Sequence, residues 1–360
     1  MIQNINFADY LYYPTLRTRA AELKGLQMLD AERKRRIIPL LTLGRWPKAL
    51  DFARSAEKAI EAVEGNPLFL DLTPDGRNLA DQHQYLRDAS NGYENWRNFV
   101  AGYANTIPVM QLGADARLRD VTRQARLAES TVGRLAFRIR DFAAETPLVK
   151  AALSALDQPA NAIVFIDSQY VRSAVSAYIT ATIATTNQLR QEFPELVISM
   201  LATSFPSSTV SFADASGQRG AIDILEREMH SRIGGSNILA YGDHSSVHSV
   251  VYDDAPIMRW AARVDYPREL DWYFERRPGN QTAEGYISSA EAIAGMDSNI
   301  GTRGIWGEQM ILDAAAGSPH GKAPAAWISV RVNIHLSRQI DFSQRLARGG
   351  EDDLDEQDAL

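Results

Sequence analysis

Short apolar runs alternate with longer amphipathic stretches along the first 250 residues of the chain. Two of these runs, residues 67–73 (P-L-F-L-D-L-T) and 162–168 (A-I-V-F-I-D-S), are rich in β-forming residues and stay apolar up to an aspartate. Such runs are typical of strands buried on both faces of a parallel sheet. Asp71 and Asp167 therefore stand where each strand leaves the core, which is the end at which parallel α/β proteins build their sites.

The alternation as a whole predicts the fold. Helical patterns separate eight strand-like runs, and this order is typical of a parallel sheet with helices outside it. Eight units within about 250 residues match a TIM-like (β/α)8 barrel, which is the fold we predict. An open doubly wound sheet is the alternative, but no G-x-G-x-x-G follows any predicted strand, which disfavours a dinucleotide site. The predicted strands are residues 12–17, 37–43, 68–72, 107–112, 132–140, 163–167, 196–204 and 238–243, and the last predicted helix among them is 220–233.

The pattern changes after the eighth predicted strand. Residues 257–265 and 269–276 predict a hairpin, two helical patterns follow, and residues 327–336 fit either a strand or a helix. If 327–336 is the closing helix, residues 253–324 form an insertion over the barrel mouth, where loops after barrel strands lie. We therefore predict one barrel domain over residues 10–348, with 253–324 as a cap-like insertion and 349–360 as a disordered acidic tail.

Composition narrows the classes of function. The chain has no cysteine, which excludes disulfides and thiolate chemistry. Its net charge is −7, but residues 351–360 carry six acids and no base, so the rest of the chain has a net charge of only −1. A nearly neutral body argues against nucleic acid as a partner. No secretory signal and no apolar run of about 20 residues is present, so we expect a cytoplasmic protein without membrane association.

Polar residues at the predicted strand ends are the candidates for chemistry. Asp71, Asp167 and Asp243 would meet at one mouth, as an acid–base pair or as ligands of a divalent cation. Arg17, Arg138 and Arg140 would bind a small anionic or phosphorylated ligand there. The structural alternative is that these aspartates cap helices or pair with the arginines.

The segment Asp243-His244-x3-His248 needs separate treatment. On a helix, His244 and His248 would share a face as metal ligands do, but residues 241–243 have the pattern of a strand end. A polar loop with hydrogen-bonded histidines is the favoured interpretation. The H-E-x-x-H, G-x-S-x-G and P-loop motifs are not evident, which disfavours zinc protease, serine hydrolase and NTPase functions.

Several segments carry a family resemblance. They are Y-Y-P-T-L-R-T-R, R-K-R-R, I-I-P-L-L-T-L and P-L-F-L-D-L-T in the N-terminal half, and Y-G-D, W-A-A-R-V-D-Y and W-I-S-V-R-V-N-I-H-L in the C-terminal half. Over about residues 10–340 the chain resembles the beta family proteins, named for the beta gene of a satellite prophage. The family pattern also places polar residues at Asp71, Arg138, Asp167, Asp243 and Arg263, which adds Arg263 to the candidate ligand-binding residues.

The resemblance implies a genetic setting. Family members occur on prophages, and in the satellite prophage beta lies beside gop and cII in a module linked to anti-phage defence, where gop is toxic and beta restrains it. The expected function is thus a regulatory, antitoxin-like component with a toxin-like protein of the same module as partner. The alternative is a hydrolase that acts on an anionic or phosphorylated substrate at the barrel mouth.

Overall fold

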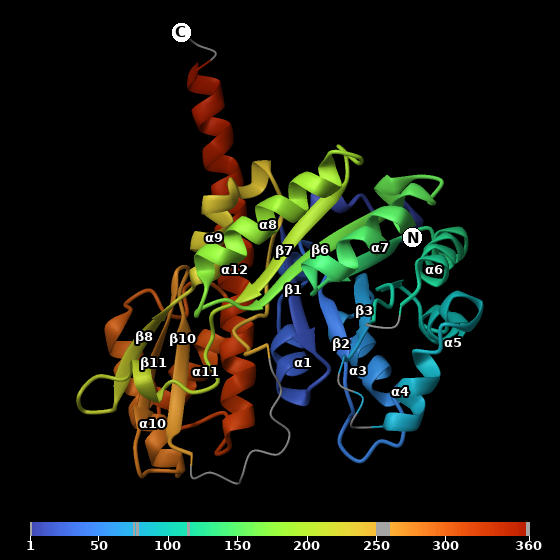
Figure 1. Ribbon diagram of the computed structural model, residues 1–360. Helices are drawn as coiled ribbons and strands as arrows, with labels where there is room; N and C mark the ends of the chain where they lie inside the picture. The colour runs from blue at the N-terminus through green and yellow to red at the C-terminus, as the bar shows by residue number, and fades with distance from the viewer. Residues whose placement is uncertain (1, 75, 77–78, 114–115, 250–259, 358–360) are drawn as a thin grey trace.

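A computed structural model gives the structure of residues 2–74, 76, 79–113, 116–249 and 260–357, the last eight by their backbone only. Parallel strands lie at its centre with helices outside them, and an antiparallel sheet with further helices lies at one side (Figure 1). The helices are α1 (Ala20–Gln27), α2 (Ala31–Arg35), α3 (Ala53–Val63), α4 (Ala80–Leu86), α5 (Ser90–Ala101), α6 (Leu118–Val132), α7 (Phe142–Ser154), α8 (Val175–Arg190), α9 (Leu225–Ile233), α10 (Ala283–Met296), α11 (Trp306–Ala315) and α12 (Pro324–Gln357).

The strands form three sheets. A five-stranded parallel sheet has the order β4-β3-β2-β1-β9, a three-stranded parallel sheet the order β5-β6-β7, and an antiparallel sheet the order β10-β11-β8. The strands are β1 (Tyr12–Arg17), β2 (Leu40–Leu43), β3 (Leu68–Leu72), β4 (Thr106–Pro108), β5 (Leu135–Ile139), β6 (Ala162–Tyr170), β7 (Val197–Thr203), β8 (Arg219–Asp223), β9 (Tyr241–Asp243), β10 (Ala262–Pro267) and β11 (Asp271–Arg277).

The two parallel sheets share one buried core. Phe69 from β3 and Phe165 from β6 meet edge to face with ring centroids 5.1 Å apart, and Tyr13 from β1 packs on Phe165 at 5.6 Å. Isolated bridges connect the edges of the sheets at Val109–Ala136 and Ser199–Ala240. The predicted parallel α/β architecture is thus confirmed, whereas a closed barrel is not shown, because the described strands belong to separate sheets rather than to one closed sheet.

One predicted helix is partly wrong. We expected residues 220–233 to be helical, but residues 219–223 form β8 and α9 begins only at Leu225. The strand arises from tertiary pairing, since β8 lies antiparallel to β11 with Gly220 opposite Phe274. A Cβ at Gly220 would lie 2.1 Å from the Phe212 carbonyl oxygen, so this close approach requires glycine.

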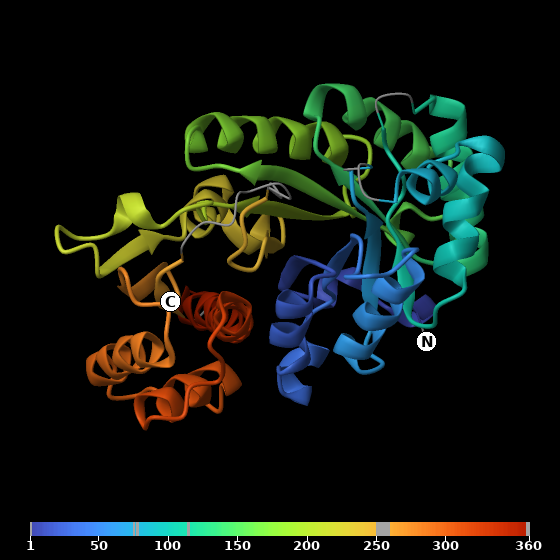
Figure 2. The ribbon, with the colours of Figure 1, turned by 90° about the horizontal axis from the view of Figure 1, so that it is seen from below.

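The C-terminal part builds onto the parallel sheets through α12. The predicted hairpin is present as β10 and β11, although residues 257–259 of the prediction lie outside the described ones. Residues 327–336 are helical within α12, which packs on α1, α11 and β10 (Figure 2). On α12, the buried Asn333 donates to the Gly25 carbonyl of α1 at 3.0 Å and accepts from the Gly307 N–H of α11 at 2.9 Å. The backbone of α12 is helical through Gln357. The predicted limits of the barrel domain, the cap-like insertion and the acidic tail remain predictions.

The contact between α1 and α12 gives a test of this packing. A Cβ at Gly25 would lie 2.8 Å from both the Ser329 carbonyl oxygen and the Val332 Cβ, whereas one at Gly295 of α10 would meet nothing within 4 Å. We expect Gly25→Ala to lower the free energy of unfolding by about 1–3 kcal/mol through overpacking. The matched control Gly295→Ala should leave it unchanged or raise it by up to ~1 kcal/mol, because alanine favours the helix. Urea unfolding of both variants measures this, and equal stabilities would contradict the packing.

Candidate functional site

A buried ion cluster lies at the carboxyl ends of the parallel strands. The Arg138 guanidinium on β5 bonds the Asp167 carboxylate on β6 through Nε at 2.9 Å and Nη2 at 2.8 Å. Its Nη1 donates to Asp71 Oδ2 on β3 at 3.0 Å and to Thr42 Oγ1 on β2 at 3.0 Å. Arg140 adds a second contact to Asp71 Oδ2 at 2.6 Å. The cluster therefore connects the two parallel sheets where both sheets end.

The charges of this cluster stabilise one another. Burial alone would raise the pKa of Asp167, but the positive charge of Arg138 and the contacts of His244 and Arg140 outweigh burial and hold that pKa well below its ordinary value. Burial would likewise lower the pKa of Arg138, and the charges of Asp167 and Asp71 reverse that effect. Both side chains are thus fully charged at neutral pH. They form the structural aspartate–arginine pair that the sequence analysis gave as the alternative to a catalytic or metal-binding role.

A histidine completes the surroundings of Asp167. His244 Nε2 lies 2.9 Å from Asp167 Oδ1, and the Gln169 backbone N–H donates to the same oxygen at 2.9 Å. His244 follows β9, and the next residues, Ser245 and Ser246, have left-handed backbone angles of φ 52° and 62°. Two consecutive non-glycine residues in this region are strained and are held by the surrounding structure. The loop therefore fixes His244 beside Asp167.

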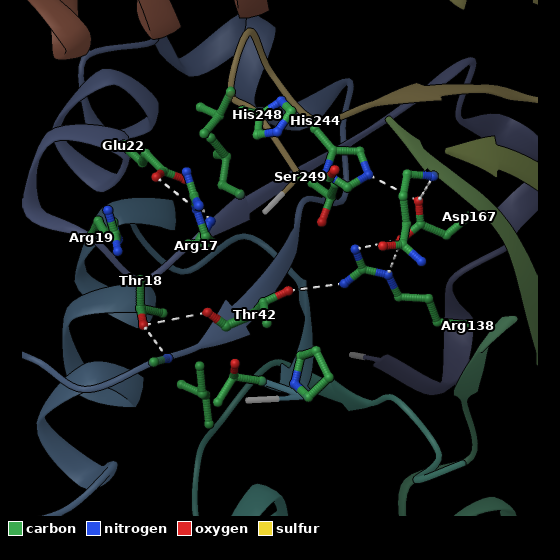
Figure 3. A pocket seen from close by; sticks show the side chains of 18 of the residues that line it. Arg17, Thr18, Arg19, Glu22, Thr42, Arg138, Asp167, His244, His248 and Ser249 are labelled. Carbon is green, nitrogen blue, oxygen red and sulfur yellow. Dashed lines mark hydrogen bonds and ion pairs between the residues drawn. The ribbon is translucent and has the colours of Figure 1, made fainter. Parts of the chain in front are cut away.

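Arg138, Asp167 and His244 line a cavity of about 350 Å³ (Figure 3). Its charged residues are five arginines and two carboxylates, which leaves a surplus of positive charge when the histidines are neutral. A second cavity of about 220 Å³ shares Arg138 and Arg140 with the first and includes Asp71. The charged and histidine residues of the first cavity are Arg17, Arg19, Glu22, Arg45, Arg138, Arg140, Asp167, His244 and His248.

Asp243, predicted to join the other two aspartates, lies elsewhere. Its carboxylate accepts hydrogen bonds from Tyr12 Oη at 2.6 Å and Tyr241 Oη at 2.9 Å, and it pairs with His335 Nε2 of α12 at 2.8 Å. Side chains alternate across a strand, so Asp243 shares the outer face of β9 with Tyr241 while His244 takes the inner face. The structure therefore brings His244, which the sequence analysis assigned to a polar loop, to the place expected for Asp243.

Of the remaining predicted ligand-binding residues, Arg17 lies at the cavity and Arg263 lies elsewhere. Arg17 lines the cavity and its Nε contacts Glu22 at 3.1 Å. Arg263 lies outside the residues that line either cavity and instead pairs with Asp265 at 2.9 Å and donates to Thr209 Oγ1 at 2.8 Å. Of the seven predicted site residues, the structure brings together Asp71, Asp167, Arg17, Arg138 and Arg140.

A divalent cation, one of the two roles considered for the three aspartates, does not fit the described side chains. Asp71 and Asp167 both face Arg138 instead of an open coordination site, and Asp243 is turned to α12. Across the described ranges no three histidine or acidic side chains gather in a way that could hold a metal ion. Within the same ranges, none of the helices combines the length and apolarity needed to span a membrane.

Comparison with known proteins agrees with the resemblance found in the sequence. The family model described as Beta protein matches residues 12–341. Protein beta of Enterobacteria phage P4 is 44% identical over 357 residues, which cover 99% of this chain and 99% of that protein. The match thus includes the parallel strands, the cavity and α12 up to Asp341.

The Asp243 cluster makes stability depend on pH. Burial would raise the pKa of Asp243, but His335, Tyr12 and the Ser245 N–H lower it to about 2. Because the folded pKa is depressed, the ionised carboxylate stabilises the fold above the ordinary pKa of 3.8, and this contribution is lost as pH falls toward 2. The other titratable groups around it are Tyr241 and, on α9, Glu226 and Arg227.

We expect Asp243→Asn to lower the free energy of unfolding at pH 7 by about 2 kcal/mol or more. The variant should also lose part of the wild-type decrease in stability between pH 4 and pH 2. Denaturant unfolding at several pH values measures both effects. A variant that keeps the wild-type acid dependence would contradict the assigned role of this carboxylate.

Proposed function

The chain belongs to the Beta protein family, and we propose that it is a regulatory protein of a phage-defence module that restrains a toxic companion protein. We further propose that its cavity binds a small anionic ligand, most readily one that carries a phosphate group. The restraining role rests on the resemblance to the beta family. The ligand class rests on the charge of the cavity, which is the observation that carries the proposal.

Five arginines line the cavity of a chain whose net charge is −7. A positive site inside a negatively charged chain concentrates anions, because low-dielectric walls focus the field of the arginines into the cavity. Guanidinium groups bind phosphate and carboxylate through paired N–H donors. These properties support an anionic ligand.

The arginines differ in how many donors they have already used. The guanidinium of Arg138 already donates hydrogen bonds to Asp71, Asp167 and Thr42. Arg45 is exposed, and among the described residues its side chain donates only from Nε to the Ala49 carbonyl at 3.3 Å, while Arg140 uses Nη2 on Asp71. Arg45 and Arg140 are therefore suited to meet a ligand, while Arg138 holds the wall of the cavity.

A hydroxyl group adds to this ligand surface. Ser249 lines the cavity, and its buried Oγ has no hydrogen-bond partner among the described residues. A buried hydroxyl without a partner carries a desolvation cost that a phosphate oxygen would remove. As part of the same proposal, the eight parallel strands act as one barrel-like scaffold whose carboxyl ends open on this cavity.

Arginine substitutions test the ligand class. We expect Arg140→Gln to weaken the binding of pyrophosphate, measured by calorimetry at low salt, by about tenfold or more, since a charged hydrogen bond contributes about 1.5–3 kcal/mol. Arg45→Gln should weaken it several-fold with little change in stability, because Arg45 has few contacts to lose. Arg232→Gln, which alters an arginine paired with Glu228 on α9, is the matched control and should bind as the wild type does. Equal binding by all three variants would refute an arginine-based anion site.

Growth tests the restraining role. Cells that express the toxic companion of the module should stop growing, and co-expression of this chain should restore growth. If the cavity regulates restraint, Arg140→Gln should change the rescue and Arg232→Gln should not. Full toxicity in the presence of the wild-type chain, at equal protein levels, would reject the antitoxin-like role while leaving the anion site intact.

A further inference from the structure

We propose that the cavity hydrolyses the phosphate ester that it binds, with His244 as general base and Asp167 as the residue that positions it. This inference rests on the ligand class of the proposed function and adds a reaction to it. It is carried by the geometry of one pair of residues at the cavity wall, supported on one side by a buried arginine and on the other by a strained loop.

Asp167 has the properties of an orienting carboxylate. Its side chain is only 1% exposed, and Arg138 holds one of its oxygens while His244 and the Gln169 N–H share the other. A carboxylate fixed by this many donors cannot rotate, and it stays ionised at neutral pH. It therefore directs the His244 ring and selects the tautomer with a proton on Nε2, because an acceptor on that side requires a donor.

The other ring nitrogen of His244 is then available for chemistry. In the tautomer that donates from Nε2, Nδ1 carries a lone pair, and no described residue is bonded to it. His244 itself lines the cavity, as do Arg17 and Arg140, and Figure 3 shows its ring bonded to Asp167. A neutral imidazole with one nitrogen held by a buried aspartate is the arrangement that general-base catalysis uses.

The loop after β9 keeps this arrangement in place. Ser245 and Ser246 adopt left-handed conformations in succession, and the Ser245 N–H donates to Asp243 Oδ1 at 2.8 Å. Asp243 is in turn fixed by Tyr12 and His335. Hydrogen bonds of this buried network behind β9 thus stabilise the strained backbone of the loop. The loop in turn holds His244 at the cavity wall.

The reaction requires water and the bound ester only. Nδ1 of His244 accepts a proton from a water molecule while the water oxygen forms a bond to phosphorus, and the bond from phosphorus to the ester oxygen breaks. The proton reaches the departing alkoxide through solvent, so the products are the alcohol and the phosphate, and His244 returns to its neutral form. Arg140 and Arg17 would neutralise the charge that develops on the phosphoryl oxygens.

The size of the cavity limits the substrate. About 350 Å³ is near the lower end of small-molecule sites, which span roughly 300–1,000 Å³. A phosphate ester of mononucleotide size fits such a volume, whereas an extended polymer would have to reach the cavity by its end. The substrate class is therefore a small phosphate ester, such as a nucleotide.

The test measures turnover and binding on the same full-length protein. Phosphorus NMR follows 4-nitrophenyl phosphate, bis(4-nitrophenyl) phosphate, nucleoside mono-, di- and triphosphates and 3′,5′-cyclic nucleotides, and calorimetry measures their binding. We expect hydrolysis of at least one compound. His244→Gln should lower kcat by about 10²–10⁴-fold with little change in affinity. His320→Gln, which alters an exposed histidine away from the cavity, should leave kcat unchanged.

A second variant guards against loss of folding. His244→Ala should be inactive, and added imidazole should restore part of its rate if the missing group is the base. Binding without turnover of any compound would overturn the hydrolytic inference and leave the anion site standing. Absence of both binding and turnover would overturn the inference and the proposed ligand class together. A His244→Gln variant as fast as the wild type would also overturn the assignment of the base.

Discussion

The contact between Arg138 and two buried aspartates is the interaction on which the site depends. Arg138 lies on β5 and reaches Asp167 in its own sheet and Asp71 in the other parallel sheet. A buried ion pair of this kind adds little net stability, since desolvation offsets the attraction, but removal of one partner leaves a buried charge and costs about 3–5 kcal/mol. The contact therefore specifies how the two sheets meet more than it strengthens the fold.

The same contact determines what the cavity offers to a ligand. Because Asp71 and Asp167 are neutralised by Arg138 and Arg140, they leave little negative charge to repel an anion. The two carboxylates that suggested a metal site in the sequence thus form ion pairs that hold the arginines of the cavity wall in place. Asp167 has a second role, because its remaining oxygen holds His244.

The sequence predicted the elements well and their faces less well. The apolar runs that end in aspartate correctly located β3 and β6. Because side chains alternate along a strand, Asp71 lies on the same inner face as Phe69, and Asp167 on the same inner face as Phe165. The same rule, applied to Gly242 and His244, would have shown that His244 faces inward and Asp243 outward. A Cβ at Gly242 would lie 2.7 Å from Cδ2 of Leu201, a residue of the core that contains Phe69 and Phe165, so Gly242 faces inward.

Other features depend on contacts between distant segments and could not be predicted from local pattern. β8 is a strand only because β11 pairs with it, and its own sequence resembles the start of a helix. Local pattern also could not predict whether the sheets close, since β4 and β9 have three residues each and only isolated bridges beside them lead to β5 and β7. Arg263 combines both kinds of contact, since it pairs with Asp265 on its own strand and donates to the distant Thr209.

Native mass spectrometry of the full-length chain, purified without added phosphate, tests the central claim that the arginine-lined cavity holds a small anion. The account predicts a bound species whose mass contains phosphorus, displaced by excess pyrophosphate and lost in the Arg140→Gln variant. A bare protein mass that pyrophosphate does not shift would contradict it.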